Sequence, residues 1–468
     1  MERIVRELAV LPFGLEKSGG FWLCIWFEFL GFEFYIRCSM KEIGIGILGF
    51  GTVGAGVVEG LQNNGGVIAE RLDLRLVLRK IADLDIESDR GVVVDDGVLT
   101  TDAVSVINDP AIDVVVELIG GTGVALDLVK LALSQGKAVV TANKKLLAEH
   151  GKELYALAEK NSADLCYGAS VGGGIPIIRA LREGLSANQV ESIYGILNGT
   201  CNYILTEMET KGLAFDVALK TAQELGFAEA DPGLDIDGFD TAHKAVILSS
   251  LSCGTAVSMD SVFVEGIRGI SKVDLDYALE LGYRIKLLAI IKRDGECMEA
   301  RVHPTLVSLD NMLASVNGVF NAVMVNSDLA DCGMYYGRGA GRMPTASTVL
   351  GDICDIARNL AVGTPHRIPA IPGAGKAVEF KSISEIVSRY YLRLSIVDEP
   401  GVLSRLTDIL ATHEISVESA MEKGSVTDGH VTAVIVTHET RETEIDVAVA
   451  GIEALDVVQG EVIRIRAL

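Results

Sequence analysis

An acidic segment in the middle of the chain, ending in a lysine, holds the residue types best suited to chemistry. Five carboxylates fall between Glu229 and Asp240, and Lys244 follows them. Residues 240–250 have the apolar periodicity of a helix, so Asp240 and Lys244 are expected one turn apart on one face. A lysine beside a carboxylate can give a proton to a carbonyl oxygen as a hydride arrives, and the upstream carboxylates can hold an ammonium group. An acidic loop with an ordinary exposed salt bridge is the alternative, and this segment alone does not decide.

A glycine-rich turn near residue 50 points to a nucleotide. The apolar run 43–48 leads into a G-x-G-x-x-G pattern at 49–54, and a helix is expected from Val53 to Gln62. In such a turn Gly49 permits the tight bend, Gly51 lets the backbone approach a pyrophosphate, and Gly54 allows close packing of helix on strand. The helix N-terminus then offers free N–H groups to the phosphates. A glycine turn of purely structural purpose in another α/β domain is the alternative.

The elements after this turn alternate between strands and helices. We expect strands at 74–82, 114–118 and 138–141, and helices at 126–135 and 145–160. This alternation predicts an α/β fold with a parallel sheet wound by helices, a Rossmann-type dinucleotide-binding domain.

The cofactor could be NAD or NADP. An acidic residue at the end of the second strand normally binds the ribose hydroxyls of NAD, and Asp83 is a candidate. Arg79 and Lys80, just before it, could instead hold a 2′-phosphate. Lys144 follows the strand 138–141 and lies at the carboxyl edge of the sheet, where ligands bind. It could also be an ordinary solvated lysine.

Two further glycine-rich turns and one turn of small polar residues follow. Residues 171–176 lead into a helix at 176–183, a strand at 193–197 ends in the turn 198–203, and residues 337–341 precede a helix at 345–359. Each turn could lie against a ligand or serve structure alone.

Together these motifs resemble homoserine dehydrogenases. GFGTVG at 49–54, ANK at 142–144, SVGGGIPI, NGTCNYI, DIDGFDTAHK and GRGAG occur in the family's order and at similar spacing. The resemblance extends from Met40 to about Asn359, and the segment around Asp240 and Lys244 is its most specific part.

The resemblance implies NAD(P)H-dependent reduction of aspartate 4-semialdehyde to homoserine, in the biosynthesis of threonine, methionine and isoleucine. By this likeness Lys244 is the proton donor and Asp240 its partner. Glu229, Asp235, Thr200 and Lys144 are implied to contact the substrate. The likeness adds Phe50, Thr52, Val53, Lys144, Gly199, Gly339 and Gly341 to the expected cofactor-binding residues, which already include Gly49, Gly51, Gly54, Arg79 and Lys80.

One position departs from the family's pattern. The family has Glu before the A-S-V-G turn, where this chain has Gly168. In the family that position belongs to a sodium site. Its other ligands are backbone carbonyls, here those of Val171, Gly173 and Ile175. A monovalent cation is thus a weak expectation.

The C-terminal region predicts a small regulatory module. Strands at 390–396, 415–421, 430–437 and 457–465 alternate with helices at 402–412 and 441–454, the β-α-β-β-α-β order of a ferredoxin-like unit. Its D-E-P-G-V-L start resembles ACT domains, which pair across subunits and bind amino acids. Threonine is the expected effector, and an oligomerisation domain without a ligand is the alternative.

Composition limits the remaining classes. With a formal net charge of −23 and no basic run, the chain is not expected to bind nucleic acid. The apolar stretch near residues 21–35 is too short and too charged to span a membrane. We expect a cytoplasmic homodimer or homotetramer that acts on a small molecule. Two other functions compete with this one. They are an NAD(P) oxidoreductase that acts on another amino-acid semialdehyde and a non-catalytic amino-acid sensor.

These observations divide the chain into six parts. They are an atypical extension at 1–39 that reads as a gene-model artefact, a nucleotide domain at 40–168, a catalytic domain at 169–344, a helix returning to the nucleotide domain at 345–362, a linker at 363–385 and the ACT domain at 386–468.

Overall fold

Three sheets organise the part of the chain that the computed structural model describes, which is residues 10–12, 21–26, 33–38, 40–371, 373, 377–427 and 430–468. The first sheet is a separate antiparallel one of β1 (Val10–Pro12), β2 (Phe21–Trp26) and β3 (Glu33–Cys38). It belongs to the N-terminal extension, much of which lies outside the described residues. No helix in the described ranges is long and apolar enough to cross a membrane.

The second sheet is the predicted nucleotide fold. Its six strands are all parallel, in the order β6-β5-β4-β7-β8-β9. The strands are β4 (Lys41–Leu48), β5 (Leu74–Ala82), β6 (Leu99–Thr100), β7 (Val114–Glu117), β8 (Ala138–Thr141) and β9 (Leu165–Cys166). The helices between them are α1 (Thr52–Leu72), α2 (Ala103–Asn108), α3 (Val124–Ser134) and α4 (Lys144–Lys160). The α/β prediction is confirmed, although α1 runs to Leu72 rather than ending at Gln62.

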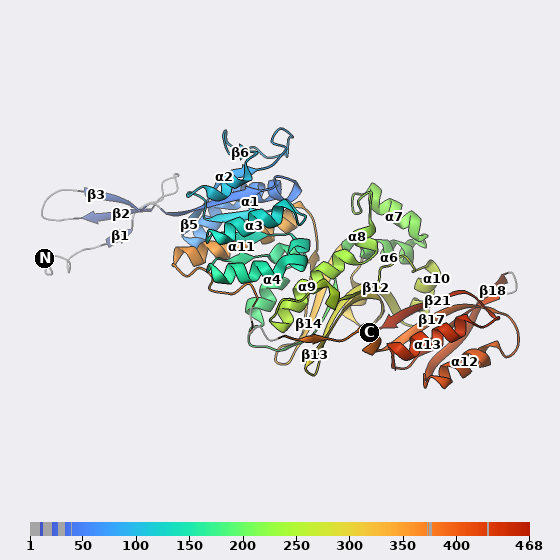
Figure 1. Ribbon diagram of the computed structural model, residues 1–468. Helices are drawn as coiled ribbons and strands as arrows, with labels where there is room; N and C mark the ends of the chain where they lie inside the picture. Colours follow the sequence, from blue (N-terminus) through green and yellow to red (C-terminus); the bar gives the residue numbers. More distant parts are fainter. Residues whose placement is uncertain are drawn as a thin grey trace.

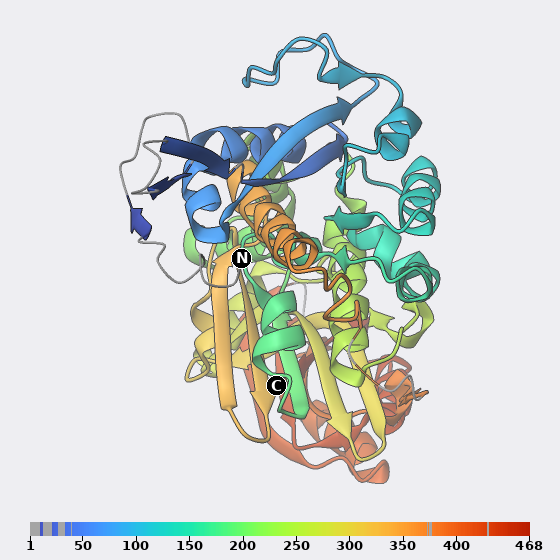
Figure 2. The ribbon, with the colours of Figure 1, turned by 90° about the vertical axis from the view of Figure 1, so that its left-hand side faces the viewer.

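Helix α11 (Arg342–Ala361) returns from the catalytic domain to lie along α1. Two glycines of α1 permit this close approach, because a Cβ at Gly56 would lie 2.9 Å from the Arg342 side chain and one at Gly60 only 2.4 Å from Leu350. An ion pair of 2.8 Å between Arg342 and Glu59 adds to the contact. The orange helix among the blue elements in Figure 2 shows this return.

The third sheet joins the catalytic and C-terminal domains. Its main path is β15-β14-β10-β12-β13-β21-β17-β19-β18. The catalytic strands are β10 (Val190–Ile196), β11 (Phe263–Val264), β12 (Tyr283–Asp294), β13 (Cys297–Ser308), β14 (Phe320–Ser327) and β15 (Asp331–Arg338). Helices α5 (Ile177–Arg179), α6 (Gly199–Lys211), α7 (Phe215–Glu224), α8 (Gly233–Ile236), α9 (Phe239–Cys253) and α10 (Lys272–Glu280) accompany them. The helix expected at 176–183 is α5 followed by a π-helical turn.

The C-terminal domain has the predicted order, with β17 (Val387–Val397), α12 (Val402–Thr412), β18 (Val417–Thr427), β19 (His430–Thr437), α13 (Glu442–Glu453) and β21 (Val458–Ala467). A short strand, β16 (Glu379–Phe380), precedes this unit, and another, β20 (Thr440–Arg441), lies within it between β19 and α13. β21 pairs in parallel with β13 at Thr305 and Leu306, so the C-terminal sheet continues the catalytic one. Figure 1 shows this domain in red at the end of the molecule opposite the nucleotide domain.

A buried group of charges holds the C-terminal domain to the catalytic domain. Arg466, 1% exposed, donates to both carboxylate oxygens of Glu442 at 2.5 and 2.9 Å, and to Glu265 of the catalytic domain at 2.8 Å. The hydroxyl of Tyr390 donates to Glu442 at 2.6 Å. We call these four residues the interdomain cluster.

Candidate active site

A cavity of about 650 Å³ opens where the carboxyl edge of the parallel sheet meets the catalytic domain. Val53 and Lys144 line it from the nucleotide domain, and Thr345 lines it from α11. From the catalytic domain come Gly199, Thr200, Glu229, Asp235, Asp240, Lys244, Gly339 and Gly341. Most of the residues expected to contact substrate or cofactor therefore face one space.

Lys244 lies at the wall of this cavity and is almost completely buried. It sits one turn after Asp240 on α9, and its ammonium donates to Asp240 Oδ2 at 2.7 Å and to the backbone oxygen of Leu197 at 2.6 Å. Lysine has three N–H donors, so one remains for a ligand in the cavity. The expected helix and the expected one-turn pair are both present.

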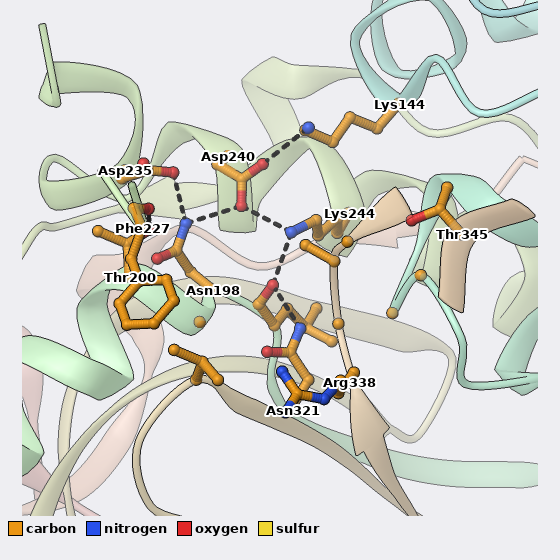
Figure 3. Close-up of a pocket in the computed structure, with 18 of the residues that line it drawn as sticks. Lys144, Asn198, Thr200, Phe227, Asp235, Asp240, Lys244, Asn321, Arg338 and Thr345 are labelled. Atoms are coloured by element: carbon orange, nitrogen blue, oxygen red, sulfur yellow. Dashed lines mark hydrogen bonds and ion pairs between the residues drawn. The ribbon is translucent and has the colours of Figure 1, made fainter. Parts of the chain in front are cut away.

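Asp240 contacts three side chains and is linked to a fourth through Asn198. Its Oδ1 forms an ion pair with Lys144 at 3.1 Å, while its Oδ2 accepts hydrogen bonds from Lys244 and from the Asn198 amide at 2.7 and 2.8 Å. The same amide group donates to Asp235 at 2.7 Å. Figure 3 shows these side chains converging on Asp240 from the two domains. We call Lys144, Asn198, Asp235, Asp240 and Lys244 the cleft cluster.

The charged groups of the cleft cluster shift one another's pKa values. Burial opposes the ionised form of Asp240, but the two lysines outweigh burial and hold the pKa of this carboxyl well below its usual range. Burial lowers the pKa of Lys244, an effect that Asp240 partly offsets. The charge of Asp240 raises the pKa of Lys144. Burial and the charge of Asp240 raise the pKa of Asp235. Lys244 thus gives up a proton more readily than a lysine in water.

The glycine-rich turn has the geometry of a phosphate cradle. Gly49 adopts φ of 102°, and a Cβ there would lie 2.6 Å from the Leu118 backbone. A Cβ at Gly54 would lie 2.2 Å from the Gly49 oxygen, so the first turn of α1 presses on the strand. The space around Gly51 is open, and the N-terminus of α1 has no side-chain cap. Its free N–H groups fit a pyrophosphate.

Comparison with known proteins gives the family of this architecture. Profiles of the homoserine dehydrogenase NAD-binding domain, homoserine dehydrogenase itself and the ACT domain match residues 49–168, 176–354 and 390–456. The homoserine dehydrogenase of Neisseria gonorrhoeae is 46% identical over 430 residues, which are 91% of this chain and 99% of that protein. This chain belongs to the homoserine dehydrogenase family.

Solved structures agree with this assignment. The crystal structure of a homoserine dehydrogenase from Thiobacillus denitrificans superposes with a TM-score of 0.87 at 43% identity, over 92% of this chain and 99% of that one. A hyperthermophilic archaeal homoserine dehydrogenase in complex with NADPH is 28% identical, with a TM-score of 0.58, over 67% of this chain and 97% of that one.

Two asparagines belong to this homoserine dehydrogenase site although sequence reasoning missed them. Asn198 caps α6 by accepting the Cys201 N–H at 2.8 Å while its amide holds the two carboxylates. The sequence signal that could have identified Asn198 is its position directly before Gly199 and Thr200. Asn321, on β14, donates to the same Leu197 oxygen that holds Lys244, at 2.9 Å. A Cβ at Gly339 would lie 2.0 Å from the Asn321 amide nitrogen, so this glycine makes room for Asn321 as well as lining the cavity.

Other predicted residues have protein partners of their own. The Thr200 hydroxyl donates to the Phe227 oxygen at 2.6 Å. Arg79 pairs at 2.7 Å with Glu42, at the far end of β4 from the glycine turn, and Lys80 donates to the Gly97 oxygen at 2.5 Å. The structure therefore does not bring Arg79 and Lys80 to the nucleotide turn. Asp83 is the residue beside it, since one of its oxygens accepts the Phe50 N–H at 2.5 Å.

Two of the backbone oxygens of the expected cation site already accept hydrogen bonds. The Gly173 oxygen accepts a hydrogen bond from Thr348 at 2.7 Å, and the Ile175 oxygen accepts one from the Ile177 N–H at 2.8 Å. Gly168 supplies no side chain. No group of three or more His, Cys, Asp or Glu side chains within the described ranges could hold a metal ion.

Proposed function

We propose that this homoserine dehydrogenase family member reduces L-aspartate 4-semialdehyde to L-homoserine, with Lys244 as the proton donor. The observation that carries the proposal is the unused third N–H of a buried lysine on the wall of the shared cavity. An aldehyde oxygen bound there would be polarised before reaction, and an ammonium with a lowered pKa gives it a proton readily.

The residues of the cleft cluster account for the proton that the reaction needs. A bound reduced nicotinamide supplies a hydride to the aldehyde carbon. Lys244 gives a proton to the oxygen as the C–O double bond becomes a single bond. Asp240, whose pKa is held low, stays ionised and stabilises the ammonium form of Lys244 before the transfer. Asn321 fixes the Leu197 oxygen that orients this ammonium.

The other charges suit the two ends of the substrate. Asp235 has a carboxylate oxygen bonded to Asn198 and retains further acceptor capacity, and Glu229 is exposed at the cavity wall. These two carboxylates suit the substrate ammonium. Lys144 contacts Oδ1 of Asp240, whereas Lys244 contacts Oδ2, and Lys144 also borders a neighbouring cavity of about 290 Å³, so it suits the substrate carboxylate.

For the cofactor we propose a preference for NAD(H) over NADP(H). Asp83 ends β5 beside the glycine turn, where a carboxylate accepts ribose hydroxyls and repels a 2′-phosphate. Arg79 and Lys80 are occupied elsewhere. Asp83→Ser should move the ratio of kcat/KM values toward NADPH, whereas the neighbouring Asp85→Ser should leave the ratio unchanged. A wild-type preference for NADPH would contradict the proposal.

We also propose that the ACT domain binds threonine and inhibits the enzyme. Glu265 of the interdomain cluster is followed by Gly266, where a Cβ would lie 2.2 Å from the Ile236 oxygen, and the Ile267 N–H donates to that oxygen at 2.8 Å. Ile236 is the neighbour of Asp235 in the cleft cluster. A displacement of β21 would therefore be passed through a short stretch of packed backbone to Asp235, one of the two protein carboxylates proposed to bind the substrate ammonium. Because ACT domains pair across subunits, a homodimer or homotetramer is the expected form, and light scattering with and without threonine measures it.

The first experiment is turnover of aspartate 4-semialdehyde with NADH and NADPH, followed by the absorbance of the reduced nicotinamide, with and without threonine. Turnover with inhibition supports both parts of the proposal. Folded protein that binds cofactor but turns over only another amino-acid semialdehyde would contradict the substrate. Threonine that neither changes the rate nor gives heat in calorimetry would contradict the effector.

A further inference from the structure

The loop at residues 316–319, directly before β14, forms part of the wall of the active-site cavity. Val319 lines the cavity, and a Cβ at Gly199 would lie only 2.9 Å from the Val319 oxygen, so the loop lies against the first turn of α6. Two residues later, Asn321 donates to the Leu197 oxygen at 2.9 Å, and that oxygen orients the proposed proton donor. The position of this loop therefore affects both the cavity wall and the group that gives the proton.

Helix α6 holds one side of the loop. Asn202, near the start of this helix, is only 2% exposed. Its amide nitrogen contacts three backbone oxygens, those of Val316, Gly318 and Phe320, at 3.1, 2.9 and 3.2 Å. One turn further along the helix, the Thr206 hydroxyl accepts the Gly318 N–H at 3.0 Å. The helix that begins at the cavity thus also fixes the loop beside it.

A buried lysine on β12 holds the other side. Lys286 is 1% exposed, and its ammonium donates to the Val316 oxygen at 2.6 Å and to the side-chain oxygens of Asn202 and Asn317, both at 3.1 Å. A lysine ammonium has three N–H donors, so all three are used within the protein. Lys286 differs in this respect from Lys244, which keeps a donor for the cavity.

The charge of Lys286 is costly in this position. Burial lowers its pKa to about 8, an effect that the Glu209 carboxylate opposes and the Arg284 guanidinium increases. Glu209 is itself paired with Arg284 at 2.8 Å. An apolar side chain of similar length would avoid the cost of burying this charge. What Lys286 supplies in return is a fixed set of donors, two of which reach the loop.

We propose that Lys286 is a positioning residue for the reaction. Together with Asn202 it fixes the loop 316–319. Through the loop it fixes Val319 at the cavity wall and the start of β14, from which Asn321 reaches the backbone that orients the proton donor. The kinetic part of this inference rests on the proposed function, whereas the fixing of the loop does not.

The kinetic test compares two methionine variants at a temperature where both are folded. Lys286→Met keeps the length of the side chain and removes its donors. It should lower kcat about tenfold or more and change the semialdehyde KM and the cofactor Kd about threefold or less, because small displacements affect the reacting geometry most. Lys292→Met is the matched control, since Lys292 lies on the same strand but is exposed. Equal kcat values for the two variants would overturn the proposal.

A milder variant keeps the test open if Lys286→Met does not fold. Asn317 is exposed, so Asn317→Ala should leave the fold intact while it removes one acceptor of Lys286. Its kcat should fall in the same direction by a smaller factor, with KM unchanged. A kcat equal to that of the wild type would then overturn the proposal.

Hydrogen exchange of the loop tests the inference without turnover. The Gly318 N–H, bonded to Thr206, should exchange several-fold faster in Lys286→Met than in Lys292→Met, as measured by mass spectrometry on peptides that cover the loop. Unchanged exchange would overturn the inference even if the enzyme reduces aspartate 4-semialdehyde. Faster exchange in an enzyme that reduces only another semialdehyde would support the fixing of the loop and contradict the proposed substrate.

Discussion

Two largely buried groups of charges in this enzyme are built differently. In the interdomain cluster, Arg466 is 1% exposed, Glu442 is 2% exposed, and the guanidinium meets both oxygens of Glu442 and one of Glu265. In the cleft cluster the partners are lysines and an amide, and the group borders a cavity.

The difference lies in unused hydrogen-bonding capacity. The interdomain cluster matches a planar, five-donor guanidinium to carboxylates, which is a geometry suited to permanent contact. The cleft cluster leaves a donor on Lys244 and acceptor capacity on Asp235, both beside open space. Burial of charge alone therefore does not mark a candidate active site, whereas buried charges that keep unused hydrogen-bonding capacity beside a cavity point to one.

The largest effect is expected from removing the donor of the cleft cluster. Lys244→Ala should lower kcat about a hundredfold to ten-thousandfold, because the alkoxide then lacks a positioned proton donor. Cofactor affinity, measured by nicotinamide fluorescence, should change little. Lys145→Ala is the matched control, since Lys145 is exposed and pairs loosely with Glu149 at 3.8 Å. If Lys244→Ala and Lys145→Ala were equally active, the cleft cluster would have no catalytic role to distinguish it from the interdomain cluster.

Breaking the interdomain cluster should cost stability. Arg466→Met leaves the buried carboxylate of Glu442 with only Arg464, at 3.3 Å, as a cation, and should lower the free energy of unfolding by up to about 3–5 kcal/mol. The double variant Arg466→Met/Glu442→Gln should recover part of this loss, because the buried charge at position 442 is then gone. Denaturant unfolding followed by circular dichroism measures both. A single variant as stable as the wild type would show that this group contributes little to the contact.

The pH dependence of the rate should report Asp240 through Lys244. Reduction of the aldehyde needs the ammonium form of Lys244, so the rate should fall at alkaline pH as that group loses its proton. Asp240 raises the pKa of Lys244 against the larger lowering by burial. Asp240→Asn should therefore move the alkaline fall in kcat/KM to lower pH. Movement to higher pH would contradict the proposed electrostatic role.

The smallest effect should come from an ion pair in neither cluster. Arg405 and Asp456 lie 2.8 Å apart in the ACT domain with side chains 46% and 81% exposed. Water screens such a pair, so Arg405→Ala should cost only about 0.2–1 kcal/mol. The Tm measured by calorimetry should shift little and kcat should be unchanged. A loss comparable with that of Arg466→Met would show that exposure does not separate these contacts.

Local patterns in the sequence predicted much of this molecule. The strands at 74–82, 138–141 and 430–437 and the helix at 402–412 have the bounds expected from their apolar periodicity. The cleft pair Asp240 and Lys244 was predictable because one turn of helix separates them. These features depend on residues near one another in the chain.

Contacts between distant segments could not be read in this way. The long strands β12 to β15 were not predicted, and with them Asn321 was missed, because their pairing depends on register across a sheet. Nothing in the sequence indicates that Asp352 fills the space beside Gly168 or that β21 pairs with β13. The roles of the individual site residues stay predictions until the variants are measured.

The way β13 is covered has a consequence for shortened forms of the enzyme. Three separate segments occupy its outer side, β11 at Arg301 and Val302, β16 at Cys297 and Met298, and β21 at Thr305 and Leu306. Removal of the C-terminal domain would leave backbone N–H and C=O groups of β13 unpaired, and such an exposed strand edge invites association with another chain. The ACT domain should therefore also protect this strand edge from association with another chain.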